Sequence, residues 1–470
     1  MSEKLAKIRS DYSTDARLKR LFFLLMPLKL SVALFRKFVD KNRERNNLEA
    51  AKFLVDTNSI YPTRIYFLVG KFLRFSLALG DVKLPKSYID EVIKSLHESH
   101  RNPARRKSAC EQILSATSTL SPQQTSAHGW KLVSLALSGL GFIRAGTIAR
   151  NHCLTAALSE VSSRNASNRV KNLAIKGLLE SRRFDDAQHL IEHQASSIDS
   201  LTEDDTYNVY LTLLNHRRAE YRIQSHVVET EVEKLFSSLV YGKSIALVAP
   251  GVIEKEYGHE IDSHDTVIRV KFNGRSAMPD EKFVGRRCDI TSQNSELLTL
   301  AKLDKLDLSV AISDAPDLKL IIAKKGEFGT IDGVPVKRMH TWAPTFLTTA
   351  TSGTLMIFET LRYSPRQIKL FGFDFYTNFQ IYNHVLLAEY KSSLSPDGHI
   401  PRSLKWSGEN LATHTAANTH ISHDLKSDFL LVKNLYELSG LIDGTPEVLE
   451  ILNLTADEYD ARLEDMLGDW

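Results

Sequence analysis

The sequence predicts an α/β protein, in which an all-α region of helical hairpins precedes a doubly wound, mostly parallel sheet. Two patterns indicate this order. In 130–145 and 170–191, apolar residues recur every three or four positions, as on one face of a helix. After residue 243, short apolar runs bounded by turn residues alternate with a helical segment, which is typical of parallel sheets.

Length and charge suggest four segments. At 470 residues the chain exceeds the size of one ordinary domain. We place a basic N-terminal segment at 1–48, an all-helical region at 49–240, a sheet domain at 241–440 and an acidic C-terminal tail at 441–470. The formal net charge of +3 gives no argument for binding nucleic acid.

The segment 1–48 holds twelve Lys and Arg against five Asp and Glu. Its apolar run at 21–35 is shorter than the roughly 20 residues that a bilayer span needs, and no small-residue cleavage site follows. A helix lying on an anionic membrane surface and an ordinary core helix both fit this pattern. The first reading predicts a peripheral protein on the inner face of a bacterial membrane.

The helical region contains two candidate hairpins, at 128–158 and 172–193. Their rhythm is weakly similar to tetratricopeptide repeats, although no strict period is present. Such a unit suits stacking or binding a protein partner. The three cysteines, Cys110, Cys153 and Cys288, form no CxxC pair, so we expect buried free thiols in a reducing cytoplasm.

Several apolar runs in the C-terminal half read as strands. They cover 244–250, 265–270, 288–293, 308–314 and 368–374. A helix is predicted over 351–363. Because ligands bind at the carboxyl ends of the strands in such sheets, we expect the site in the loops after Val248, Val270, Ile290 and Phe373.

These loops contain residues that suit a phosphorylated ligand. Gly251 permits a close backbone approach, although a tight turn alone explains it more simply. Arg269, Lys271 and Asn273 follow one another at a strand end, and Asn294 ends the next strand. Cations and amides there suit a phosphate and a nucleobase or ribose, while ordinary solvated side chains would give the same pattern.

The next two loops add hydroxyl groups. Thr351, Ser352 and Gly353 open the predicted helix, where exposed N–H groups attract anions and where hydroxyls often serve only as caps. Tyr376 and Tyr382 follow the last strand, and neutral phenols can donate to a departing phosphate without a metal. Two aromatic residues packing a loop would look the same.

His423 is the candidate general base for a sugar hydroxyl. Asp428 follows after four residues and could orient the ring, although a surface histidine capping a helix at 424–439 has the same spacing. Asp374 ends a strand and is placed with the ligand-binding residues. The loop at Gly251 is neither GxGxxG nor a P-loop, and no Asp-x-Asp metal motif is present, so we expect no metal cofactor.

Taken together, these elements resemble the bacterial sialyltransferases of glycosyltransferase family 42 over about 243–440, and the first part of that stretch looks like the large sialyl motif of family 29. The matching elements are the glycine loop at Gly251, the turn Gly285-Arg286-Arg287-Cys288 before Asn294, Thr351-Ser352-Gly353, Gly372 to Tyr376, Tyr382, and the pair His423 and Asp428.

The resemblance implies a GT-A-variant, Rossmann-like nucleotide-sugar fold and an inverting, metal-independent sialyltransferase. Such an enzyme moves an acidic sugar from a CMP-activated donor to a glycan or glycolipid acceptor, in capsule or lipopolysaccharide synthesis. It implies that Tyr376 and Tyr382 hydrogen-bond the leaving phosphate and that His423 takes the acceptor proton. The residues that would contact CMP or the donor sugar are Thr351, Ser352, Gly353 and Asn294.

Two positions depart from the family pattern. Pro250 stands where the family has asparagine in the glycine loop, and Lys271 stands two residues after Arg269, again in place of asparagine. Lys271 could hold the phosphate or the donor carboxylate, so other CMP-linked acidic sugars, notably Kdo, stay open as donors. A helical-repeat scaffold with an inactive nucleotide-sugar fold is the alternative of another class, and the retention of both tyrosines together with His423 speaks against it.

Overall fold

The computed structural model describes residues 82, 84–101, 103–162, 166–194, 230–272, 274–275, 280–293, 314–324, 329–339, 343–377 and 423–466. The chain divides into two compact units, Met1–Thr57 and Asn58–Trp470, and every described residue belongs to the second. The basic segment 1–48, the predicted strand 308–314 except its last residue, and Asn273, Asn294 and Tyr382 lie outside the described residues.

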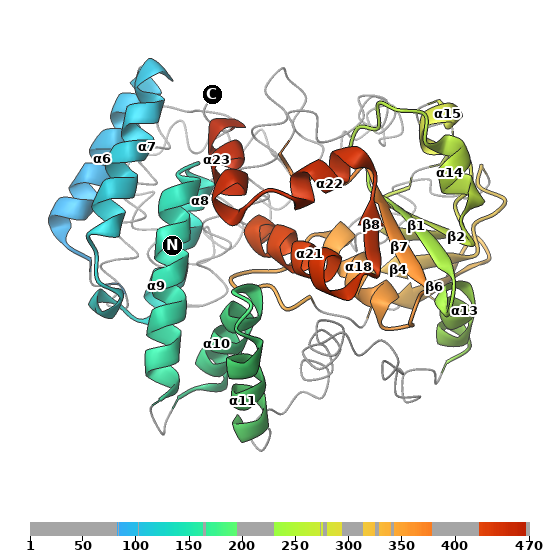
Figure 1. Ribbon diagram of the computed structural model, residues 1–470, viewed down its shortest axis with the longest axis horizontal. Helices are drawn as coiled ribbons and strands as arrows, with labels where there is room; N and C mark the ends of the chain where they lie inside the picture. Colours follow the sequence, from blue (N-terminus) through green and yellow to red (C-terminus); the bar gives the residue numbers. More distant parts are fainter. Residues whose placement is uncertain are drawn as a thin grey trace, which may run out of the picture. The chain divides into compact units, whose positions relative to one another are not determined.

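Helices precede the sheet, as Figure 1 shows. They are α6 (Lys86–Arg101), α7 (Arg106–Ser118), α8 (Ala127–Gly139), α9 (Ile143–Val161), α10 (Asn168–Glu180) and α11 (Phe184–Gln194), with short 3-10 turns at Pro103–Arg105 and Pro122–Gln124. The two predicted hairpins correspond to α8–α9 and α10–α11. Ser126 and Ser167 start α8 and α10 by accepting N–H groups of the first turn, and Gly141 turns the chain between α8 and α9 with φ of 79°.

The sheet has eight strands in the order β5-β6-β4-β3-β2-β1-β7-β8. Their bounds are β1 (Ser244–Val248), β2 (Thr266–Val270), β3 (Ile290–Gln293), β4 (Leu320–Ala323), β5 (Thr330–Ile331), β6 (Val334–Arg338), β7 (Gln367–Phe371) and β8 (Ile442–Gly444). Every neighbouring pair is parallel except β5 and β6. The prediction of an α/β protein with a mostly parallel sheet is therefore confirmed.

The chain order reverses in the middle of this sheet. From β1 the chain adds β2, β3 and β4 towards one edge, whereas β7 and β8 lie on the other side of β1. Ile245 on β1 pairs with Thr266 on one side and with Ile368 on the other. Ligands of doubly wound sheets bind at such a reversal, beyond the carboxyl ends of the strands.

Both faces of the sheet are covered. Along β1, Ile245 and Leu247 belong to the large hydrophobic core, while Ala246 and Val248 pack against Ile261 on the opposite face. The helices of the sheet region are α13 (Glu231–Val240), α14 (Gly258–Ser263), α15 (Glu281–Val284), α18 (Ser352–Leu361), α21 (Leu425–Ser439), α22 (Pro446–Leu452) and α23 (Ala456–Met466).

The helical region and the sheet share one core. Ile143, Ile175 and Ile191 of α9, α10 and α11 lie in the same buried cluster as Ile245 of β1 and Phe358 of α18. Burying a helix face against the sheet is thus what holds these hairpins in place. The free cysteines Cys110, Cys153 and Cys288 are all buried. Across the described ranges, no helix is both long and apolar enough to cross a membrane.

The C-terminal segment differs from the prediction. Residues 441–470 were expected to form an acidic tail, but β8, α22 and α23 lie there. Tyr459 and Leu463 are fully buried, and the Tyr459 hydroxyl donates to the carbonyl of Phe375 at 2.8 Å. The prediction considered only the acidic residues of this segment. Its apolar residues recur at helical spacing, and they form the face that packs on the core.

Candidate functional site

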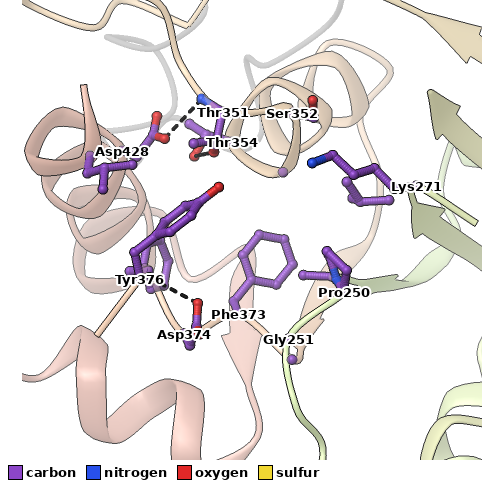
Figure 2. Close-up of a pocket in the computed structure, with 16 residues that line it drawn as sticks. Pro250, Gly251, Lys271, Thr351, Ser352, Thr354, Phe373, Asp374, Tyr376 and Asp428 are labelled. Carbon is purple, nitrogen blue, oxygen red and sulfur yellow. Dashed lines mark hydrogen bonds between the residues drawn. The ribbon is translucent and has the colours of Figure 1, made fainter. Parts of the chain in front are cut away.

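A hollow of about 600 Å³, open to solvent, lies where the chain order of the sheet reverses. Its walls come from the loops after β1, β2 and β7 and from the starts of α18 and α21 (Figure 2). The lining residues are Ala249, Pro250, Gly251, Val270, Lys271, Thr351, Ser352, Gly353, Thr354, Gly372, Phe373, Asp374, Phe375, Tyr376, Leu425 and Asp428. Three of the four loops at which the sequence predicted the site, those after β1, β2 and β7, thus line the hollow.

The start of α18 supplies donors that suit an anion. The hydroxyl of Thr351, at the N-cap, makes no capping bond to the helix backbone. The Thr351 N–H donates to Oδ2 of Asp428 at 2.9 Å, which fixes the helix start to α21. In Figure 2, Lys271 extends its ammonium group towards the start of α18. A helix N-terminus and a cation facing one hollow favour a bound phosphate or carboxylate.

Backbone strain gathers at this hollow. Lys271, Phe375 and Tyr376 have φ of 59°, 46° and 62°. Left-handed backbone costs about 1 kcal/mol or more at such residues, and it is concentrated where side chains must be aimed. Here it directs the side chains of Lys271 and Tyr376 into the hollow, where Figure 2 shows the Tyr376 phenol pointing towards Thr354.

Two carboxyl groups at the hollow are short of partners. Oδ2 of Asp374 and Oδ1 of Asp428 have no hydrogen-bond partner within the described part of the chain. Oδ1 of Asp374 accepts the N–H of Tyr376 at 3.0 Å, which stabilises the strained turn. Desolvation by burial raises the pKa of each carboxyl to about 7. Near neutral pH both groups can therefore either accept or donate a hydrogen bond.

The glycines of the hollow serve close packing between its loops. A Cβ on Gly251 would lie 2.2 Å from the carbonyl oxygen of Gly372, and a Cβ on Gly353 would lie 2.8 Å from Cε1 of Phe373. Gly372 itself has φ of 66°. Gly251 therefore serves the close approach of the β1 and β7 loops at the hollow.

Arg269 does not reach the hollow, although it was predicted to bind the ligand. Its buried guanidinium donates to the carbonyl oxygens of Arg287 at 2.7 Å and Val284 at 2.6 Å. Burial lowers its pKa. The reason is the alternation along β2, which sends neighbouring side chains to opposite faces, so that Arg269 holds the 284–287 turn instead.

His423 lies beside the hollow rather than in it. It lines a smaller adjoining hollow together with Arg150 and Asp424. Its Nδ1 is 3.0 Å from the carbonyl oxygen of Ala350 and 3.2 Å from that of Thr349. Carbonyls only accept, so Nδ1 carries the proton and Nε2 is left as the acceptor.

The predicted pairing of His423 with Asp428 is wrong. Asp428 accepts the N–H of Thr351, whereas two backbone carbonyls orient the imidazole. Helix α21 starts with Asp424 as its N-cap, accepting the Ser427 N–H, so His423 is not a cap either. Desolvation, and after it the positive charges of Lys324 and Lys271, lower the pKa of His423 to about 3.

Lys324 is a site residue that the sequence analysis missed. It follows β4, and its ammonium group is 3.4 Å from the carbonyl oxygen of Ala350, which also accepts from His423. The signal was present, since Leu320–Ala323 is a short apolar run between lysines, typical of a buried strand with a charged end. Asn273, Asn294 and Tyr382 lie outside the described residues, so their predicted roles stay predictions.

Two further findings bear on the site. Among the described residues, no group of three or more His, Cys, Asp or Glu side chains is placed to hold a metal ion. The chain matches no protein-family model and no curated protein sequence. Function is therefore inferred from the geometry of the hollow and from the sequence motifs that form it.

Proposed function

We propose that this protein is an inverting, CMP-sugar-dependent glycosyltransferase, similar to the sialyltransferases, with a Rossmann-like nucleotide-sugar fold. One observation carries the proposal. At the reversal of a parallel sheet, the start of α18, the Lys271 ammonium and the Tyr376 phenol face one hollow. These groups are the donors that a departing nucleotide phosphate needs, and they lie where doubly wound folds bind nucleotides.

In the proposed reaction, the bond between the sugar and the CMP phosphate breaks and leaves its electron pair on the phosphate. The sugar then carries oxocarbenium-like charge, and an acceptor hydroxyl attacks from the opposite face. Lys271, Tyr376 and the N–H groups of α18 stabilise the leaving phosphate. We assign the hydroxyl proton to Nε2 of His423, which lies beside the hollow and whose Nδ1 already donates to backbone carbonyls.

The acidic donor sugar is supported by the number of cations. Lys271 lines the hollow, and the Lys324 ammonium lies 3.4 Å from the Ala350 carbonyl oxygen, which also accepts from His423. A donor such as CMP-sialic acid or CMP-Kdo carries a carboxylate besides its phosphate, and two cations suit two anionic groups. We assign Asp374 to a ribose hydroxyl, because it lines the hollow and its Oδ2 has no partner in the described structure.

The test is binding and turnover with defined nucleotides. CMP should raise the melting temperature, and UMP or GMP should not, since a ligand that binds only the folded state stabilises it. Release of CMP from CMP-sialic acid and from CMP-Kdo, with and without glycan acceptors, then identifies the donor. If no cytidine nucleotide binds, the proposal is wrong; if CMP binds and no donor turns over, the chain is an inactive nucleotide-binding scaffold.

Tyr376→Phe separates catalysis from binding. A phenol that donates only to the leaving phosphate should affect kcat about tenfold to a hundredfold and leave the donor KM nearly unchanged. The matched control is Tyr363→Phe, because that tyrosine is buried behind α18 and does not line the hollow. A loss confined to KM would reject the assigned role of Tyr376.

A further inference from the structure

A buried ionic cluster joins the helical region to the start of α21. The Arg150 guanidinium on α9 is 5% exposed. It donates to Oδ1 and Oδ2 of Asp424 at 2.9 and 3.0 Å, to Oε1 of Glu180 at 2.7 Å and to Oγ of Ser427 at 2.6 Å. One arginine of α9 thus donates hydrogen bonds to three residues, one at the end of α10 and two at the start of α21.

The same acceptors hold the loop that leads to α18. Oδ2 of Asp424 accepts the Leu347 N–H at 2.7 Å, and Oγ of Ser427 accepts the Phe346 N–H at 2.9 Å. The Asp424 N–H donates to the carbonyl oxygen of Thr349 at 3.1 Å. The Arg150 guanidinium also stacks over the Phe346 ring, 4.9 Å from its centre. The loop is therefore fixed to α21 through groups that Arg150 positions.

This loop also orients the imidazole. The carbonyls of Thr349 and Ala350 accept from Nδ1 of His423, which is the residue before Asp424. Any shift of the loop against α21 moves these carbonyls relative to the ring. In contrast, the N–H of Thr351 is held by Asp428, which makes no bond to Arg150 in the described structure. The base and the anion-binding helix start are anchored separately.

The buried charges of this cluster have a desolvation free energy that a purely structural contact would not require. The cluster buries one cation with two carboxylates, Glu180 and Asp424, and desolvation of such groups often cancels their attraction. Apolar side chains of similar volume would stabilise an interface equally well. What the ionic cluster adds is directional hydrogen bonding, which defines one register between α9, α21 and the 346–350 loop.

We infer that Arg150 is a positioning residue for His423. Helices α9 and α10 would then help to hold the catalytic base in place. This rests on the proposed function. Arg150 touches no substrate in this account; it acts through Asp424 and Ser427 on the carbonyls that set the ring. Loss of its forked geometry should therefore reduce proton removal and spare donor binding.

The experiment compares Arg150→Lys with Arg182→Lys in the full chain. Lysine keeps the charge and loses the planar fork. Arg182 is the matched control, since it also joins the helical region to α21, through Asn434 at 2.6 Å, but far along the helix from His423. We expect kcat of Arg150→Lys to fall roughly a hundredfold with donor KM within about threefold, and Arg182→Lys to stay near the wild type. Equal losses in both variants would overturn the inference.

A second readout does not need activity. The ring signals of His423 in an NMR spectrum should shift, and its titration midpoint should move towards 6.5, in Arg150→Lys and not in Arg182→Lys. An unchanged midpoint in Arg150→Lys contradicts the positioning role even if no sugar donor is ever found. Should Arg150→Lys fail to fold, Ser427→Ala removes the Phe346 contact while keeping every charge, and the same outcomes apply.

Discussion

At the scale of single residues, burial and neighbouring charges shift the pKa values of the site residues away from those typical of their residue types. His423 is an ordinary imidazole by sequence, but desolvation and two lysines hold its pKa near 3. Asp374 and Asp428 shift the other way, to about 7. The hollow therefore has two carboxyl groups that titrate in the physiological range, and a neutral histidine lies beside it. Such shifted groups are typical of sites that move protons.

An anionic ligand should raise the pKa of His423. Lys271 and Lys324 disfavour the imidazolium, and a bound phosphate would offset their charge. NMR titration of the free protein should give a midpoint well below 6.5, and saturation with CMP should raise it by about one unit or more. A midpoint that CMP leaves unchanged would place the phosphate away from these lysines.

Asp428→Asn should alter stability with a definite sign. The pKa of Asp428 is raised in the folded state, so the folded state binds the proton more tightly than the unfolded state does. This proton binding stabilises the fold fully below pH 3.8, where the unfolded carboxyl is protonated too. It is lost as the pH rises through about 7. Asparagine cannot ionise and keeps an oxygen for the Thr351 N–H. We expect the unfolding free energy of the variant, measured in urea, to fall less than that of the wild type between pH 4 and 8.

A control for Asp428→Asn is Asp428→Ala, which also cannot ionise but leaves the Thr351 N–H without its acceptor. It should be less stable than the asparagine variant by about 1–3 kcal/mol at every pH. Identical stability of the two variants would mean that the hydrogen bond to Thr351 contributes nothing.

At the scale of elements, the hollow depends on how closely the β1 and β7 loops meet. Gly251 and the carbonyl of Gly372 approach each other with no room for a side chain. The loop after β7 then turns through two left-handed residues, Phe375 and Tyr376, and Tyr459 of α23 donates to the carbonyl of Phe375. A helix from the C-terminal segment thus supports the strained turn that aims Tyr376.

Gly251→Ala should destabilise the protein through a steric clash. The new Cβ would lie 2.2 Å from a backbone oxygen, so the two loops must separate, at a cost of about 1–3 kcal/mol. Gly242→Ala is the comparison, because Gly242 has φ of 65° and nothing within 4 Å of the added Cβ. It should cost about 1 kcal/mol from backbone strain alone and leave CMP binding unchanged. If both variants lost the same free energy of unfolding and bound CMP equally well, the β1 and β7 loops would be able to separate without cost.

At the scale of the whole molecule, helices α9, α10 and α11 and the sheet region are built around one shared hydrophobic core. Apolar residues of α9, α10 and α11, of the sheet and of α22 and α23 belong to a single buried cluster. Buried ion pairs cross it, including Arg150 with Asp424 and Lys426 with Asp460. The helical region is therefore part of the architecture of the site.

Truncation after Gly440 should abolish folding. It removes β8, which pairs with β7 beside the hollow, and the buried side chains of Tyr459 and Leu463. In the described part of the deleted segment, eight apolar side chains are buried. Burial of each contributes about 1.5–3 kcal/mol, so the loss is comparable to or larger than the roughly 5–15 kcal/mol by which an ordinary domain is stable. Truncation after Met466 is the control and should remain soluble with a cooperative melting transition. A folded protein ending at Gly440 would restore the idea of a dispensable acidic tail.

Local pattern was sufficient for much of this fold. The apolar runs predicted β1, β2, β3 and β7 to within three residues at each end, and helical periodicity predicted both hairpins. α18 was predicted between two strands, with cap residues at its start, and α21 agrees with the helix at 424–439 that the alternative reading of His423 assumed. β4, β6 and β8 were not predicted, although β4 and β6 are as long as the predicted strands. β6 contains Pro335, which argues against a strand. β8 has three residues and contains Asp443 and Gly444, so its pattern is too brief to distinguish it from a loop.

The sequence by itself determined which residues stand at the carboxyl ends of the strands, and hence that Lys271, Thr351 and Tyr376 meet at one hollow. Only the tertiary structure decided the partners: Asp428 for Thr351, two carbonyls for His423, and Arg150 for Asp424. The physical reason is distance along the chain. Strand ends follow from local periodicity, whereas a hydrogen bond between residues 77 or 274 positions apart depends on how the whole chain packs.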